Sequence, residues 1–276
     1  MSRPGSDAPG GSGRALLKRL YFEALWVRVA AQRRLERTGV AHRPSIGAVE
    51  AQDTEVLQSA AQWQQARRAV RRLRLPAHPE RSKNWDSLGA LATILRRTGP
   101  DATVLDAGAA LYSSLLPSLH LYGYSNLVGI NLEIGRERAF GSVRFRHGDV
   151  TRMEFADSSI DAIACLSVIE HGVAVKEFLV DSARVLKDNG TLTVSTDYDS
   201  SPPDTSNKVA YGVPVHIFSP AEIVELIGTA KAAGLELLGS FSPDHSERPV
   251  TWARMGLDYT YVRLSFARVP RISPAA

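Results

Sequence analysis

Apolar runs of strand length alternate with helical segments along most of this chain, from residue 90 to residue 267. Because neighbouring parallel strands need a crossover connection, usually a helix, this alternation predicts a mostly parallel sheet with helices on both faces. Asp188, Asn189 and Gly190 predict a turn, and Gly234 predicts a helix end. Seven strands are predicted, at residues 103–107, 126–131, 143–147, 160–167, 191–196, 235–241 and 259–267. Helices are predicted at residues 90–97, 111–121, 136–140, 175–186 and 220–233.

The residues before this alternation predict a helical extension. Residues 1–13 are rich in Gly, Ser and Pro and predict a disordered tail, whereas residues 14–37 have the apolar spacing of an amphipathic helix. A second helical stretch is predicted over residues 53–73, and Pro76 and Pro79 then break the chain. We therefore divide the chain into the tail 1–13, a helical extension 14–80 and a domain 81–276. The first helix is a candidate oligomer contact, active-site cap or membrane-surface helix, and a plain structural appendage is the alternative.

Composition limits the class of protein. Apolar residues make up 44% of the 276 residues, enough for a globular core. The single cysteine, Cys165, lies in an apolar run and predicts a buried thiol without a disulfide, which fits a cytoplasmic protein. No apolar stretch approaches the ~20 residues needed to cross a bilayer. Arginine is concentrated before residue 75, which suggests nucleic acid or an anionic membrane as partner; without aromatic stacking motifs, solvated helix faces are the favoured interpretation.

A small-residue turn follows the first strand of the predicted sheet. Asp106 lies near the end of that strand, and Gly108, Ala109 and Ala110 come directly after it. Glycine adopts backbone angles closed to other residues, and alanines leave little side chain between the main chain and a ligand. The pattern predicts a nucleotide-like ligand at this turn, with an ordinary tight turn as the alternative.

An ordered series of segments resembles the class I S-adenosylmethionine-dependent methyltransferases, from about Asp86 to Arg268. The resemblance implies a Rossmann-like class I methyltransferase fold with a mostly parallel seven-stranded sheet and helices on both faces. The helical extension precedes this domain in the chain. The matching segments are Val104-Leu105-Asp106-Ala107-Gly108, Leu127-Val128-Gly129-Ile130-Asn131, Gly148-Asp149-Val150, Phe155-Ala156-Asp157-Ser158-Ser159-Ile160-Asp161-Ala162-Ile163, Ser167-Val168-Ile169-Glu170-His171 and Val185-Leu186-Lys187-Asp188-Asn189-Gly190-Thr191-Leu192.

The resemblance implies S-adenosylmethionine as cofactor. Asp106 would hold the cationic methionyl group, and Gly108 would allow its close approach. Ala110 stands where the family commonly has a second glycine, which narrows the pocket and leaves a non-catalytic, cofactor-binding protein as an alternative. The ribose would be bound by Asn131, which replaces the family's usual acidic residue, or by Glu133.

The remaining cofactor residues follow later strands. The resemblance implies that Asp149 accepts a hydrogen bond from the adenine amino group and that Val150 packs on the ring. Ser167, at the exit of the fourth strand, completes the predicted cofactor set.

Transfer to a hydroxyl requires a general base near the sulfonium. His171 is the first candidate because it follows the fourth strand at the ligand edge of the sheet, and Glu170 beside it could orient its ring. His216 is a second candidate for the base. Asp197, Tyr198 and His216 are the predicted acceptor-binding residues.

A divalent metal is not favoured, although one group of residues has the required ligand types. Asp197, Asp199, Asp204 and His216 carry oxygen and nitrogen ligands, but no tight spacing joins them. We predict no metal site from these residues.

The predicted function is an O-methyltransferase acting on a small polar acceptor. The stretch Ile217-Phe218-Ser219-Pro220-Ala221-Glu222-Ile223 and the later Asp258-Tyr259-Thr260-Tyr261 resemble methyltransferases of glycan and saccharide pathways, so a sugar or oligosaccharide, including a mannose-containing one, is the favoured acceptor. A nucleic-acid methyltransferase that uses the N-terminal arginines is the alternative.

Overall fold

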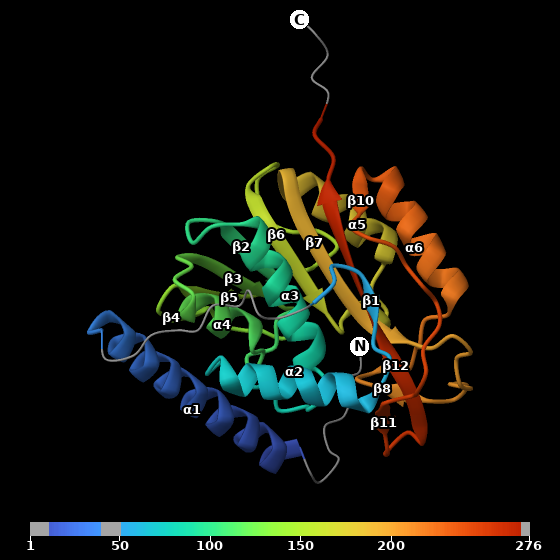
Figure 1. Ribbon diagram of the computed structural model, residues 1–276, viewed down its shortest axis with the longest axis horizontal. Coiled ribbons are helices and arrows are strands. Elements are labelled where there is room, and N and C mark those ends of the chain that lie inside the picture. The colour runs from blue at the N-terminus through green and yellow to red at the C-terminus, as the bar shows by residue number, and fades with distance from the viewer. Residues whose placement is uncertain (1–10, 40–50, 272–276) are drawn as a thin grey trace, which may run out of the picture.

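The computed structural model describes residues 11–39 and 51–271, without the side chains of residues 11–19 (Figure 1). The main sheet has ten strands in the order β1-β12-β7-β6-β2-β3-β5-β4, and β10 and β11 also pair with β12. Its strands are β1 (Glu55–Val56), β2 (Thr103–Ala107), β3 (Asn126–Ile130), β4 (Arg138–Phe140), β5 (Val143–Arg146), β6 (Ile160–Leu166), β7 (Leu186–Tyr198), β10 (Leu235–Leu237), β11 (Val250–Trp252) and β12 (Leu257–Arg268). A separate hairpin is formed by β8 (Val209–Ala210) and β9 (Val213–Pro214).

The centre of the sheet is parallel, as predicted. β5, β3, β2, β6 and β7 pair in parallel, whereas β12 runs antiparallel to β7. This arrangement confirms the Rossmann-like fold, in which the carboxyl ends of β2, β3, β6 and β7 meet at one edge. Within the described residues, the main sheet has three strands beyond the predicted seven, β1, β4 and β11, and the β8–β9 hairpin was not predicted either.

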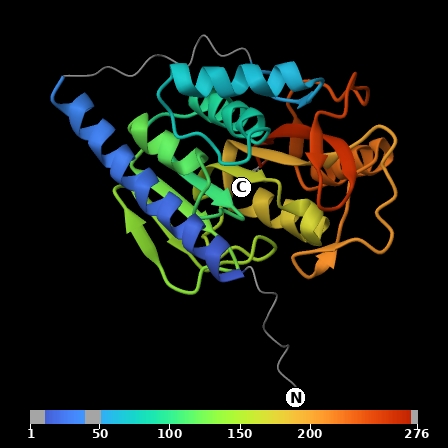
Figure 2. The same ribbon diagram turned by 90° about the horizontal axis from the view of Figure 1, so that it is seen from below.

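Helices cover both faces of the sheet (Figures 1 and 2). Side chains alternate along β2, so that Val104 belongs to the apolar cluster of the first helices and Leu105 to the cluster of the last two. The helices are α1 (Gly11–Arg37), α2 (Ala60–Arg72), α3 (Asn84–Arg97), α4 (Leu115–Leu121), the 3-10 turn η2 (Ile169–His171), α5 (Val175–Val185) and α6 (Pro220–Ala232). No helix among residues 11–39 and 51–271 is both long and apolar enough to span a membrane.

The N-terminal helix lies beside α4 in both views (Figures 1 and 2). Phe22 and Trp26 of α1 are buried, and the Trp26 ring stacks on Phe140 with 5.0 Å between ring centroids. Helix α1 begins at Gly11, so residues 11–13 are helical and not part of a disordered tail; residues 1–10 lie outside the described part. The exposed side of α1 carries Val27 and several arginines.

Two predicted helices are wrong in whole or in part. Residues 136–140 contain β4, which pairs with β5 through a turn at Gly141 and Ser142, because Gly141 takes the left-handed backbone that a tight hairpin requires. Residues 53–73 begin with β1 instead of helix, and α2 starts only at Ala60. The apolar spacing of these short segments does not distinguish strand from helix.

Of the two predicted turns, the structure confirms only the one at Gly234. Asp188, Asn189 and Gly190 lie within the long strand β7, where the register with β6 shifts between Ile160 and Ala162. Gly234 follows α6 with a positive φ of 84°, which confirms the predicted helix end.

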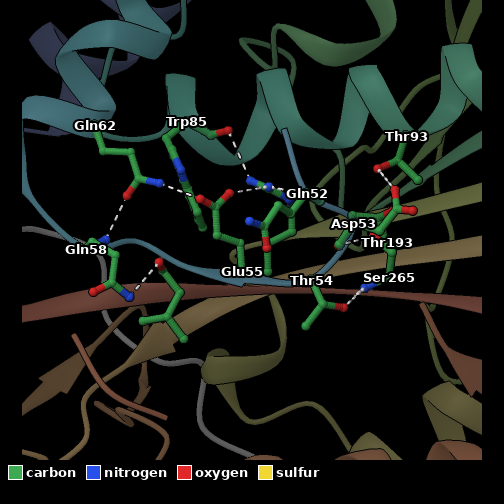
Figure 3. Close-up of polar contacts among 12 residues, drawn as sticks. Gln52, Asp53, Thr54, Glu55, Gln58, Gln62, Trp85, Thr93, Thr193 and Ser265 are labelled. Carbon is green, nitrogen blue, oxygen red and sulfur yellow. Dashed lines mark hydrogen bonds and ion pairs between the residues drawn. The ribbon is translucent and has the colours of Figure 1, made fainter. Parts of the chain in front are cut away.

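Three short strands cover the outer edge of β12 in succession: β11, β1 and β10. The segment 51–58, which contains β1, lies between α3 and β12 (Figure 3). Asp53 accepts hydrogen bonds from Thr93 Oγ1 at 2.8 Å, Arg96 Nη2 at 2.6 Å and Arg97 Nη2 at 3.0 Å. Part of the predicted extension therefore joins the sheet, and the division at residue 80 stays a prediction.

Arg263 of β12 is fully buried beneath this segment. Its Nη2 donates to the Gln52 carbonyl at 2.9 Å and to Glu55 Oε2 at 3.0 Å, and its guanidinium lies 4.4 Å from the Trp85 ring centroid. Gly89 makes room for it, because a Cβ there would lie 2.1 Å from Arg263 Cζ. One buried cation thus joins β1, α3 and β12.

Arg263→Met is expected to lower the free energy of unfolding by about 3 kcal/mol, because removing one partner of a buried pair leaves the other groups unsatisfied. Chemical denaturation measures this change. Arg96→Met is the matched control: the Arg96 side chain is 41% exposed, so losing its ion pair with Asp53 should cost under ~1 kcal/mol. Equal losses in the two variants would contradict the special role of Arg263.

Candidate active site

A pocket of about 1310 Å³ opens at the carboxyl ends of β2, β3, β6 and β7. In a sheet of this topology, ligands bind at that edge. Of the residues predicted from the sequence, the pocket is lined by Asp106, Gly108, Ala110, Asn131, Glu133, Val150, Ser167, Glu170, His171 and Asp197.

The turn after β2 has the close backbone approach that its sequence predicts. The amides of Gly108 and Ala109 both donate to the Ile130 carbonyl, at 2.8 and 3.0 Å. Gly108 has a φ of 88°, and a Cβ at this position would lie 2.4 Å from Val168 Cγ2. Both the backbone angle and the space therefore require glycine.

Asp106 at the end of β2 is a buried carboxyl in the wall of the pocket. Ser113 Oγ donates to its Oδ2 at 3.0 Å. Burial raises the pKa of Asp106 to about 7, and the neighbouring Asp86 adds to the rise while the Ser113 hydrogen bond opposes it. A cationic group in the pocket would favour the ionised form of this carboxyl.

Asn131 shapes the turn after β3. Its Nδ2 donates to the Gly108 carbonyl at 3.1 Å, and its Oδ1 accepts from the Glu133 amide at 2.8 Å. The amide thus links the two turns and places the exposed Glu133 at the pocket rim. Because the Asn131 amide already holds backbone groups, the Glu133 carboxylate is the less engaged of the two polar side chains at this edge.

Asp149 does not line the pocket. Its Oδ1 accepts from the Thr151 amide at 2.8 Å and from Thr151 Oγ1 at 2.7 Å, and these hydrogen bonds lower its pKa. The side chain closes a local turn on the surface, and its contact with an adenine amino group stays a prediction. The next residue, Val150, is buried and does line the pocket.

Glu170 and His171 lie in η2, directly after β6, and both line the pocket. Glu170 is buried and accepts from Thr196 Oγ1 at 3.1 Å. Burial, with a further contribution from Asp197, raises the pKa of Glu170 to about 8. The His171 ring packs edge-on against Tyr211, and burial lowers its pKa, so the imidazole is neutral at pH 7.

Two predicted acceptor residues lie outside this pocket. Because side chains alternate along β7, Asp197 faces the pocket and Tyr198 faces the opposite side, where its hydroxyl donates to the Pro243 carbonyl at 2.6 Å. His216 pairs with Glu222 at 3.1 Å, near the start of α6. The assignment of Tyr198 to substrate binding is therefore corrected. His216 lines a smaller cavity together with Glu170, His171 and Asp197, so its roles in catalysis and substrate binding stay predictions.

Several pocket residues were missed by the sequence reasoning. Lys83 and Asp86 come from the start of α3, Tyr112 from the loop after β2, and Tyr211 from the β8–β9 hairpin. Asp86 is buried and accepts from Ser195 Oγ at 2.9 Å, and burial raises its pKa. No spacing in the sequence connects residues 83 and 86 with residues 170 and 197; the packing of α3 on β7 brings them together.

A metal site finds no support among the described residues, where no group of three or more His, Cys, Asp or Glu side chains could hold an ion. The predicted ligands are dispersed. Asp199 is paired with Arg248 at 2.7 Å, and Asp204 closes an exposed turn with the Ser206 amide.

The comparisons with known proteins agree with this site. Residues 105–194 match a family model described as a methyltransferase domain, and this stretch runs from β2 into β7. No curated protein matches the sequence. The solved complex of the Haloferax volcanii Trm112 methyltransferase activator and the protein described as its methyltransferase contains a similar chain: 16% identity, TM-score 0.51, covering 78% of this chain and 99% of that one.

Two more solved structures share the fold. Geranyl diphosphate C-methyltransferase from Streptomyces coelicolor A3(2) is 20% identical, with a TM-score of 0.50 over 69% of this chain and 78% of its own. A geranyl diphosphate methyltransferase in complex with S-adenosylmethionine is 15% identical, with a TM-score of 0.50 over 80% of this chain and all of its own. The chain has the fold of the class I methyltransferases and contains, at residues 105–194, a stretch that matches a methyltransferase domain.

The residues present fit S-adenosylmethionine. Gly108 lets the main chain turn at the pocket wall, Asp106 offers a buried carboxyl to a cation, and Val150 adds an apolar wall. When bound, the cofactor supplies an electrophilic methyl group on a sulfonium. Ala110 narrows the turn by one methyl group but lines the pocket without closing it.

Proposed function

We propose that this methyltransferase acts on a hydroxyl group of a sugar or oligosaccharide. The observation that carries the proposal is the composition of the pocket beyond the cofactor turn. Buried carboxyl groups at Glu170 and Asp197 lie among the aromatic side chains of Tyr112, Tyr211, Trp252, Tyr259 and Tyr261. Carboxyl groups bind hydroxyls, and aromatic faces pack on the apolar faces of a sugar ring. A protein of the same fold methylates geranyl diphosphate, so the shared fold does not identify the acceptor of this chain.

His171 is proposed as the general base. A hydroxyl is a weak nucleophile, and its proton must leave as the oxygen attacks the methyl carbon. The neutral His171 imidazole at the pocket wall can accept this proton, whereas burial keeps the neighbouring Glu170 protonated at pH 7. The backbone turn at Gly108 and the carboxyl of Asp106 hold the methyl donor in place. The main contribution of the pocket is then to align the methyl donor with the acceptor hydroxyl.

The test is a screen of methyl transfer from S-adenosylmethionine to a panel of mono- and oligosaccharides, with mannose-containing members included. Transfer to at least one saccharide, with the methyl ether located by NMR, is the expected result. A parallel reaction with RNA and DNA, repeated across a salt series, checks the exposed arginines of α1 and α2. Exposed arginines give an affinity for phosphates that falls with salt. Methylation of nucleic acid with no saccharide methylated would therefore replace the saccharide acceptor with a nucleic acid.

A further inference from the structure

The β8–β9 hairpin carries an aromatic residue in a backbone conformation that aromatic residues rarely adopt. Its two-residue connection is Tyr211-Gly212, and both residues have a positive φ, 54° for Tyr211 and 82° for Gly212. Such a connection favours Gly, Asn or Asp, because most other side chains crowd the backbone at positive φ. Tyr211 is the aromatic residue among the six non-glycine residues with positive φ in the described part of the chain. The turn therefore does not require a tyrosine at this position.

Burial does not explain Tyr211 either. The residue is 72% exposed, so its ring adds little to the apolar core. The base of the hairpin packs instead: Ala210 and Val215 are buried, and Lys208 Nζ donates to the Met255 carbonyl at 2.8 Å. These contacts hold the hairpin in place while its tip stays outside the core. A ring kept at a strained and exposed position points to a role in function.

The ring of Tyr211 lines the large pocket and contacts the proposed base. Its centroid lies 5.2 Å from the centroid of the His171 ring, with an angle of 69° between the two planes. Tyr112, from the loop after β2, lines the same pocket and packs edge-on against His78, with 5.7 Å between ring centroids. Aromatic rings from four segments that are distant in the sequence thus line one pocket, and Tyr211 is the exposed one among them.

We propose that Tyr211 is an acceptor-binding residue whose ring stacks on one face of the sugar that carries the reacting hydroxyl. A sugar ring has C–H groups on its faces, and these pack well on the electron-rich face of an aromatic ring. The contact between Tyr211 and His171 places the stacked sugar beside the imidazole. Because the hairpin holds the ring there before the acceptor arrives, less ordering is needed on binding. The inference rests on the proposed transfer to a saccharide and adds the residue that selects a ring-shaped acceptor.

The first test needs no acceptor. Asn tolerates positive φ better than Tyr, so the melting temperature of the full chain with Tyr211→Asn is expected to stay level or to rise by up to about 3 °C. Arg74→Asn is the matched control, because Arg74 is exposed, has nearly the same φ of 55° and does not line the pocket. A melting temperature that falls in Tyr211→Asn but not in Arg74→Asn would show that the ring serves the fold, and would overturn the inference.

The second test measures KM for the saccharide that the screen identifies. Tyr211→Asn should raise this KM about tenfold, the loss expected for an aromatic contact at the centre of a binding site, with the affinity for S-adenosylmethionine within about twofold. Tyr211→Phe keeps the ring and should stay within about threefold of the unmodified chain, and Arg74→Asn should leave KM unchanged. A loss in Tyr211→Phe as large as in Tyr211→Asn would contradict stacking, because only the hydroxyl differs.

The outcomes separate the role of Tyr211 from the proposed acceptor. Methylation of a saccharide with the same KM in Tyr211→Asn and the unmodified chain would keep the acceptor class and reject the role of Tyr211. Methylation of no saccharide by the unmodified chain would reject the acceptor class, and the stacked sugar with it. A raised KM in Tyr211→Asn at an undiminished melting temperature would support both.

Discussion

His171→Ala is expected to lower kcat about 100-fold or more on a saccharide acceptor, while the affinity for S-adenosylmethionine stays within about twofold. General bases typically contribute this much, and His171 lines the pocket. Single-turnover kinetics measure the methyl-transfer step, and calorimetry measures the affinity. Because the imidazole must be neutral to accept a proton, the rate should fall as the pH drops through the lowered pKa of His171.

The comparison variant is His216→Ala, which tests the second candidate base. His216 pairs with Glu222 and lines the smaller neighbouring cavity instead of the large pocket, so the variant should retain activity within about threefold. A full rate in His171→Ala would remove this residue from the mechanism. A loss in His216→Ala as large as in His171→Ala would support His216 as a second catalytic residue.

Asp106→Asn is expected to weaken S-adenosylmethionine binding by tenfold to a hundredfold at pH 8, because a hydrogen bond to a charged group contributes about 1.5–3 kcal/mol. The loss should depend on pH. The pKa of Asp106 is about 7, so its carboxyl is mostly protonated at pH 6 and mostly ionised at pH 8. The ratio of the Kd of the variant to that of the unmodified chain should therefore grow as the pH rises.

Calorimetric titration at pH 6, 7 and 8 measures both Kd values. Asp188→Asn serves as the control, since Asp188 is exposed and lies outside the pocket. Equal affinity for Asp106→Asn and the unmodified chain at pH 8 would contradict the assignment of Asp106. A ratio above one that does not change with pH would show that Asp106 is ionised throughout this range, contrary to its raised pKa.

The parallel centre of the fold was predictable because its strands are buried on both faces and therefore appear as apolar runs. β2, at Thr103–Ala107, has the predicted bounds. The sheet edges were not predictable in the same way. β4 and β1 are short and are stabilised by contacts with distant residues, Phe140 with Trp26 and Glu55 with Arg263. The spacing of apolar residues within a short segment does not indicate contacts with distant residues.

The residues of the candidate site also differ in how far the sequence predicts them. Asp106, Gly108, Glu170 and His171 belong to local motifs at strand ends, and the structure brings them into one pocket. The side of β7 to which Tyr198 points depends on strand register, which the motif at residues 195–199 does not fix. Lys83 enters the pocket through the packing of a helix whose start has no recognisable motif. Sequence patterns therefore identified the strand-end residues that line the pocket but missed those that helix packing brings there.

The strand β1 also bears on where this protein can be cut. A shortened version starting at residue 81 would lack β1, and the middle of β12 would present unpaired backbone N–H and C=O groups between β11 and β10. Arg263 would lose Glu55 and the Gln52 carbonyl at the same time. Open strand edges pair with other chains. Residues 81–276 produced alone would thus tend to self-associate. In the whole chain, β1 covers the edge of β12 and prevents this pairing.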